Sequence, residues 1–193
     1  MKLLFATSNQ NKAREIQNLL PKDFQIITLN DIDLKEDIPE TAPTIEGNAI
    51  QKTEYIINNF GIDCFADDTG LEIEALNGEP GVYSARYAGE AKDSDDNMNL
   101  VLEKLKNTSN RNARFKTVIS LSINKEMHLF EGLVEGRIRA SKVGTLGFGY
   151  DPIFEPENCG RTFAEMSMEE KNSMSHRGRA FEKMISYLKN SSI

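Results

Sequence analysis

Residues 2–12 read KLLFATSNQNK, and this stretch decides how the chain begins to fold. The apolar run 2–6 predicts a strand, and apolar residues at helical spacing from Ala13 to Leu20 predict a helix that stops at Pro21. A strand that enters a helix through small polar residues presents backbone N–H groups and the positive end of a helix dipole, which can hold phosphate. Because the chain has no glycine-rich phosphate loop, this cradle would be built from Ser8, Asn9 and Lys12. The alternative is an ordinary connection in which Ser8 or Asn9 only caps the helix.

Length and composition favour one soluble domain spanning residues 1–193, since the 193 residues are 39% hydrophobic and no linker divides them. The formal net charge of -7 opposes charge-driven binding to nucleic acid or to an anionic membrane. No segment has the length of a membrane span and the amino terminus lacks the pattern of a secretory signal, so we expect a cytoplasmic protein. Cys64 and Cys159 are far apart, which predicts reduced core residues without a disulfide or a zinc site.

The first half of the chain predicts a parallel β-α-β start followed by a long helix. Gln25–Leu29 is typical of a second short strand. A helix is expected from about Thr44 to Gly61, with an apolar stripe that includes Phe60. Lys52 lies on the same stripe, and it either extends outward to water, which the spacing favours, or is aimed at a buried anion.

The second half predicts an antiparallel lobe joined to the α/β lobe. Apolar and polar residues alternate in 115–123 and 127–138, which indicates a long hairpin. Helices are expected from Ser94 or Asp95 to Lys106, after Ser167, and at the carboxyl end.

Asp67 and Asp68 interrupt two apolar runs, so we expect them at the end of a strand, where loops gather into clefts. Neighbouring strand residues point to opposite faces, and therefore only one of the two is expected to face a cleft. A carboxylate placed there can bind Mg²⁺ or act as a base on water, and Glu40 in the acidic loop 31–43 is a candidate second metal ligand. The alternative is a polar turn in which both side chains cap backbone N–H groups.

Two other segments carry candidate binding groups. The loop 147–152, with sequence GFGYDP, combines glycine freedom with an aromatic ring that can stack on a purine, or it is an ordinary turn with Phe148 in the core. Ser175–Gly178 opens the last helix with a histidine and an arginine, and Lys171 precedes it closely. A solvated basic helix start is the alternative for that segment.

Five ordered blocks of the chain resemble the Ham1-like inosine triphosphate pyrophosphatase family. They are TSNxxK at 7–12, ADDTGL at 66–71, PGxYSARY at 80–87, GFGYDP at 147–152 and SHR at 175–177. The resemblance implies an α/β fold with two lobes around a long mixed β-sheet, flanking helices and a central nucleotide cleft. It also implies a homodimer and Mg²⁺-dependent hydrolysis of non-standard purine nucleoside triphosphates (ITP, dITP and XTP) to the monophosphate and pyrophosphate.

The resemblance further implies a role for each matching residue. Asp68 would be the general base and a metal-linked carboxylate, Thr69 would contact the substrate, and Lys52 would reach phosphate. The triphosphate would be held by Thr7, Ser8, Asn9, Gln10, Asn11 and Lys12. The base would be surrounded by Phe148, Gly149, Tyr150, Asp151, Lys171, His176 and Arg177.

Two other functions remain open from the sequence. A Maf-like nucleotide pyrophosphatase also begins with a strand, a serine-rich loop and a basic helix, although the blocks at 148–150 and 175–177 favour a purine substrate. A nucleotide-sensing module that binds without hydrolysis is the other alternative. Asp68 argues against it, because added negative charge hinders anion binding unless a metal is present.

Overall fold

The computed structural model describes residues 2–22, 24–32, 34 and 38–191. Four residues of the acidic loop lie outside this description, namely Asp33, Lys35, Glu36 and Asp37. The chain divides into two compact units, which we call unit 1 and unit 2. Unit 1 comprises Met1–Asp68, Thr117–Gly132 and Arg177–Ile193, and unit 2 comprises Thr69–Lys116 and Leu133–His176.

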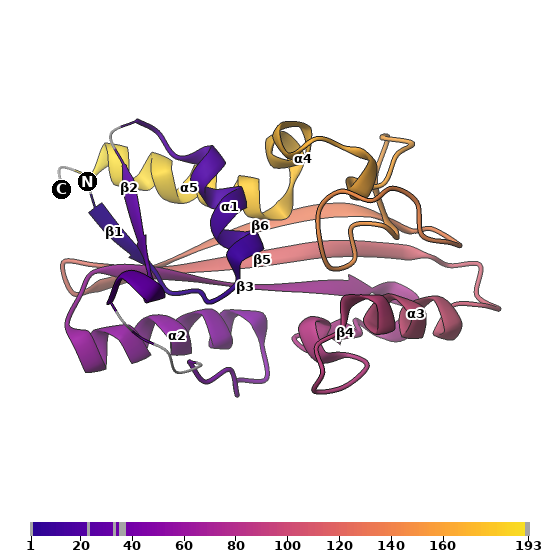
Figure 1. Cartoon of the computed structure of the whole chain (residues 1–193), viewed down its shortest axis with the longest axis horizontal. Coiled ribbons are helices and arrows are strands. Elements are labelled where there is room, and N and C mark those ends of the chain that lie inside the picture. Colours follow the sequence, from indigo (N-terminus) through magenta and orange to yellow (C-terminus); the bar gives the residue numbers. More distant parts are fainter. Residues whose placement is uncertain (1, 23, 33, 35–37, 192–193) are drawn as a thin grey trace. The chain divides into compact units, whose positions relative to one another are not determined.

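Strands and helices are mixed along the chain (Figure 1). The strands are β1 (Lys2–Phe5), β2 (Gln25–Thr28), β3 (Cys64–Ile73), β4 (Pro80–Gly81), β5 (Asn112–Ile123), β6 (Glu126–Ile138) and β7 (Phe154–Pro156). The α-helices are α1 (Gln10–Leu19), α2 (Ile45–Phe60), α3 (Ser94–Lys104), α4 (Met168–Met174) and α5 (His176–Asn190). The strand order is β2-β1-β3-β5-β6-β7, and β4 pairs with β3.

In unit 1, β1 lies parallel to both β2 and β3, which confirms the predicted β-α-β start. All three apolar residues of β1 are buried, as expected for a parallel strand covered on both faces. Leu3 and Phe5 pack in one core cluster with Ile16 of α1, whereas Leu4 packs in another with Ile56 of α2. Alternation along β1 therefore fixes α1 and α2 against opposite faces.

Helix α2 begins and ends as its sequence predicts. The hydroxyl of Thr44 accepts a hydrogen bond from the N–H of Gly47 at 3.0 Å. Gly61 closes the helix in the left-handed conformation with φ 63°, which glycine adopts without strain. Phe60, the last residue of the expected apolar stripe, lies where the helix ends and is 39% exposed.

The predicted strand end at Asp67 and Asp68 is also wrong. β3 runs without a break from Cys64 to Ile73 and carries both carboxylates in its interior. The strand accommodates them because each carboxylate meets polar or cationic side chains on its own face. The expected alternation of the two side chains is confirmed, although the expected location at a strand end is not.

In unit 2, β4 is antiparallel to β3 and β7 is antiparallel to β6. The core includes the rings of Phe115 and Phe154, whose centroids are 4.7 Å apart. Ser167 and Glu170 form the predicted capping box at the start of α4. The hairpin predicted from residues 115–138 corresponds to β5 and β6, which are adjacent in the strand order.

These pairings confirm a mixed α/β fold. Both cysteines are free, and Cys64 is buried as expected, but Cys159 is only partly buried beside the core of unit 2. Among the described residues, no helix combines the length and apolar character that crossing a membrane requires. The single domain and the central cleft stay predictions.

Candidate functional site

The turn before α1 has a specific internal structure. The side-chain oxygen of Asn9 accepts hydrogen bonds from the N–H groups of Asn11 and Lys12 at 3.0 and 3.2 Å. The hydroxyl of Thr7 accepts one from the N–H of Asn9 at 3.2 Å. Asn9 is therefore a helix cap, and the binding of phosphate by this segment stays a prediction. Cationic charge for an anion here comes from the ammonium of Lys12.

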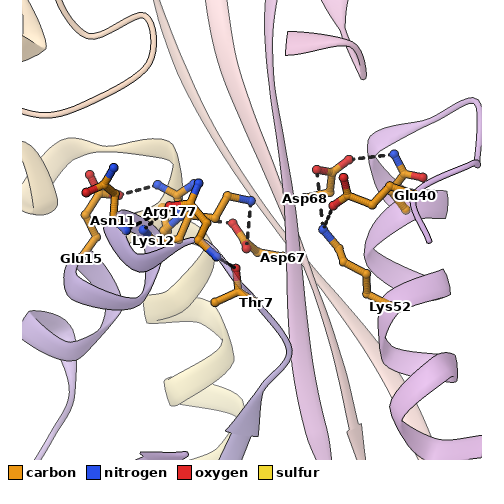
Figure 2. A network of polar contacts seen from close by, with 11 residues as sticks. Thr7, Asn11, Lys12, Glu15, Glu40, Lys52, Asp67, Asp68 and Arg177 are labelled. Carbon is orange, nitrogen blue, oxygen red and sulfur yellow. Dashed lines mark hydrogen bonds and ion pairs between the residues drawn. The ribbon is translucent and has the colours of Figure 1, made fainter. Parts of the chain in front are cut away.

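Asp67 points to the face of β3 that meets α1 and α5 (Figure 2). Its Oδ1 lies 3.1 Å from Nζ of Lys12 and its Oδ2 lies 3.2 Å from Nε of Arg177. The guanidinium of Arg177 also donates to Glu15 of α1. Burial alone would raise the pKa of Asp67, but the charges of Lys12 and Arg177 hold it well below its ordinary value. Asp67 is thus an ionised carboxylate that arranges two cations.

Asp68 points to the other face of β3, toward α2 (Figure 2). Its Oδ1 lies 3.8 Å from Nζ of Lys52, and its Oδ2 accepts a hydrogen bond from Nδ2 of Asn48 at 3.2 Å. Asp68 is 8% exposed, and burial raises the pKa of this carboxylate despite the attraction of Lys52. A carboxylate with a raised pKa near cations is suited to take a proton from water.

Lys52 does not extend outward to water, and the prediction favoured by its spacing is therefore wrong. Its side chain is buried, and its ammonium donates to Glu40 and faces Asp68. Burial would lower the pKa of Lys52, but Asp68 and Glu40 raise it above its ordinary value. The correct reading is the alternative one, a lysine aimed at buried anions.

Asp68 and Glu40 are also the predicted metal ligands. No group of three or more His, Cys, Asp or Glu side chains that could hold a metal occurs in the described part of the chain. Mg²⁺ commonly takes one or two carboxylates and completes its shell with water and substrate phosphate. Asp68 and Glu40 already share one cation, the ammonium of Lys52, and so this pair of oxygen donors fits a magnesium site.

In unit 2, Asp151 organises the loop 147–152. Its Oδ2 accepts hydrogen bonds from the N–H of Phe148 at 2.8 Å and from Nζ of Lys171 at 2.6 Å. Nζ of Lys171 also lies 4.8 Å from the centroid of the Phe148 ring. Gly147 has φ 73°, and a Cβ at this position would lie 2.0 Å from Oδ2 of Asp151. Only glycine therefore lets the carboxylate reach the backbone here.

The other predicted base-binding residues differ in their surroundings. The hydroxyl of Tyr150 donates to the carbonyl of Ser84 at 2.7 Å, which places Tyr150 in the core of unit 2. His176 is buried and its ring stacks on Phe115 with centroids 4.5 Å apart. Arg177 is 1% exposed. Their contacts with a base, and that of Thr69 with a substrate, stay predictions.

Two residues of this network, Glu15 and Asn48, were not anticipated from the sequence. Glu15 follows Lys12 by three positions and Asn48 precedes Lys52 by four. Each therefore shares a helix face with a lysine that the sequence did single out. A search for polar residues at this spacing from Lys12 and Lys52 would have found both.

Known proteins are similar to this chain over nearly its full length. A sequence model of the Ham1 family matches residues 3–187. The dITP/XTP pyrophosphatase of Flavobacterium johnsoniae is 57% identical over 188 residues, which cover 97% of this chain and 98% of that protein. The corresponding protein of Porphyromonas gingivalis is 48% identical over 97% of each chain. The solved structure of the Staphylococcus aureus Ham1 protein is 40% identical, covers 100% of both chains and has a TM-score of 0.90. These matches favour the Ham1 resemblance over the Maf-like alternative, and this chain belongs to the Ham1 family.

Proposed function

We propose that this protein hydrolyses the non-standard purine nucleoside triphosphates ITP, dITP and XTP to the monophosphate and pyrophosphate, with Mg²⁺ as cofactor. The observation that carries the proposal is the buried Asp68 carboxylate, with its raised pKa, beside Lys52 and Glu40 in a Ham1 family chain. The relatives named dITP/XTP pyrophosphatases support the substrate class.

Asp68 acts in this proposal as the general base. Its carboxylate takes a proton from the attacking water, and its raised pKa makes it a better proton acceptor than an exposed aspartate. Lys52 lies within reach of Asp68 and neutralises phosphate charge. Asp68 and Glu40 would hold Mg²⁺, which neutralises and orients the polyphosphate when bound.

Lys12 and the polar segment Thr7–Asn11 bind the triphosphate in this proposal. Asp67 supports Lys12 by holding its ammonium on one face of β3. In unit 2, Phe148, Asp151 and Lys171 form a linked group that offers an aromatic ring and a cation for a purine base. Gly149, Tyr150, His176 and Arg177 complete the proposed base-binding set, and Thr69 contacts the substrate. The homodimer and the cytoplasmic location also belong to the proposal.

A panel of nucleoside triphosphates tests this function. The protein is assayed with ITP, dITP, XTP, ATP and GTP in the presence and absence of Mg²⁺, and the phosphorus-containing products are separated. We expect monophosphate plus pyrophosphate from the first three nucleotides, and loss of turnover on removal of Mg²⁺ by EDTA. Diphosphate plus phosphate as products would mean that the terminal phosphoanhydride bond is cleaved and would contradict the proposal. Tight binding without products would favour the nucleotide-sensing alternative.

Lys12→Ala is expected to weaken triphosphate binding more than monophosphate binding. Asp67 holds the ammonium at the start of α1, where the proposal places the polyphosphate and not the base. A hydrogen bond to a charged group contributes about 1.5 to 3 kcal/mol, which corresponds to roughly a tenfold to hundredfold rise in KM for ITP. The measurement compares KM for ITP with the inhibition constant of IMP. If both constants change by the same factor, the proposed contact of Lys12 with the polyphosphate is wrong.

A further inference from the structure

Asn48 lies in the first half of α2 and its side chain is 1% exposed. Both the donor and the acceptor of its side-chain amide form hydrogen bonds. Nδ2 donates to Oδ2 of Asp68 at 3.2 Å, and Oδ1 accepts from the N–H of Ala42 at 2.9 Å. The backbone N–H of Ala42 can only donate, so it fixes the carbonyl end of the amide and leaves the donor end for Asp68.

We infer that Asn48 is a positioning residue for Asp68, holding this carboxylate in one orientation through the hydrogen bond to Oδ2. The inference rests on the proposed catalytic role of Asp68. It assigns to Asn48 an action through Asp68 and no contact of its own with the substrate.

The geometry gives Asn48 a specific effect on each oxygen of Asp68. Because Oδ2 is engaged by the amide of Asn48, rotation of the carboxylate is restricted and Oδ1 is the oxygen that faces Lys52 at 3.8 Å. Asn48 and Lys52 are four residues apart on α2, so one helix face supplies both contacts. A base or ligand held in one orientation loses less freedom when it reacts.

Gln51 provides a matched control on the same helix. Its Oε1 accepts from the N–H of Thr41 at 2.9 Å, and its Nε2 donates to the hydroxyl of Thr41 at 2.9 Å. Gln51 therefore ties the same segment to α2 through Thr41, which is next to Ala42, the residue held by Asn48. A loss of activity caused only by loosening this segment should appear in a Gln51 variant as well.

The test compares Asn48→Asp, Asn48→Ala and Gln51→Ala. Asn48→Asp keeps an acceptor for Ala42 but removes the donor to Asp68 and adds a like charge. Asn48→Ala removes both hydrogen bonds. With ITP and Mg²⁺ we expect both Asn48 variants to lose about tenfold to a hundredfold in kcat, with KM changed less than about threefold. Gln51→Ala should keep kcat within about threefold of the wild type.

A second readout needs no activity. In Asn48→Asp two carboxylates face each other, and in the double variant with Asp68→Asn the donor and acceptor are exchanged and the hydrogen bond can form again. We expect the metal-free double variant to melt at a higher temperature than Asn48→Asp alone. If Asn48→Asp does not fold, Asn48→Ala decides the kinetic comparison in the same way.

The inference is overturned if both Asn48 variants keep wild-type kcat, if Gln51→Ala loses kcat as strongly as they do, or if the double variant melts no higher than Asn48→Asp. Failure of the proposed function has a different signature, because the wild-type protein itself would then not hydrolyse ITP, and failure of the catalytic role of Asp68 would leave Asp68→Asn with turnover. Inactive Asp68→Asn with fully active Asn48 variants overturns the role of Asn48 alone.

Discussion

We expect Asp68→Asn to lower kcat for ITP by on the order of a hundredfold to ten-thousandfold, which is the usual effect of removing a positioned general base, the role proposed for Asp68. The amide has nearly the same shape as the carboxylate but accepts a proton far less readily. The folded state is expected to keep its stability, because burial already disfavours the charged form of Asp68 and raises its pKa. The measurement is steady-state turnover with Mg²⁺ together with the thermal midpoint of unfolding.

Asp67→Asn is the matched control, since it makes the same change one residue away on the opposite face of β3. Asp67 is held ionised by Lys12 and Arg177, so its neutral replacement leaves buried cations without their carboxylate. We expect Asp67→Asn to lower the thermal midpoint more than Asp68→Asn and to lower kcat less. Near wild-type turnover by Asp68→Asn would show that the catalytic assignment is wrong.

Arg177→Met is expected to give the largest loss of stability. The guanidinium is 1% exposed and is paired with Asp67 and Glu15, which are buried as well. Removing one member of a buried ion pair leaves an uncompensated charge and costs about 3 to 5 kcal/mol of unfolding free energy. Denaturant unfolding measures this loss. The double variant with Glu15→Met replaces charge by apolar volume and should recover much of it.

The same Arg177 variant tests base recognition. A donor at the 6-oxo edge favours hypoxanthine over adenine, so its loss should lower kcat/KM for ITP more than for ATP, by about 1 to 3 kcal/mol. Both nucleotides are assayed well below the unfolding temperature of the variant. Equal losses for ITP and ATP would remove Arg177 from base recognition and leave it a structural role between Asp67 and Glu15.

Local features were predictable wherever neighbouring residues alone determine them. The apolar run of β1, the Thr44 and Gly61 ends of α2 and the Ser167 capping box all depend on contacts within a few positions. The alternation that places Asp67 and Asp68 on opposite faces is likewise a property of the strand. The ordered blocks were sufficient to indicate the family, because their order along the chain is itself part of the sequence.

The extent of β3 and the burial of the Lys52 side chain could not be predicted from neighbouring residues. Two adjacent aspartates resemble a strand end because isolated carboxylates avoid burial. They remain inside β3 because Lys12, Arg177, Asn48 and Lys52 reach them from α1, α5 and α2. A lysine on an apolar helix stripe likewise resembles a side chain that extends to water. Lys52 stays buried because it meets Glu40 and Asp68, and neither is its neighbour on α2.

The sequence by itself determined the strand at β1, the ends of α2, the capping box of α4, the placement of the two β3 carboxylates on opposite faces and the family to which the chain belongs. Only the tertiary structure decided which charges are paired, and through burial and pairing the direction of each pKa shift. Asp67 and Asp68 have the same side chain and adjacent positions, yet the pKa of Asp67 is lowered and that of Asp68 is raised. The physical reason is that burial penalises either charge, whereas the compensating cations come from elements far apart in the chain and reach Asp67 more closely than Asp68.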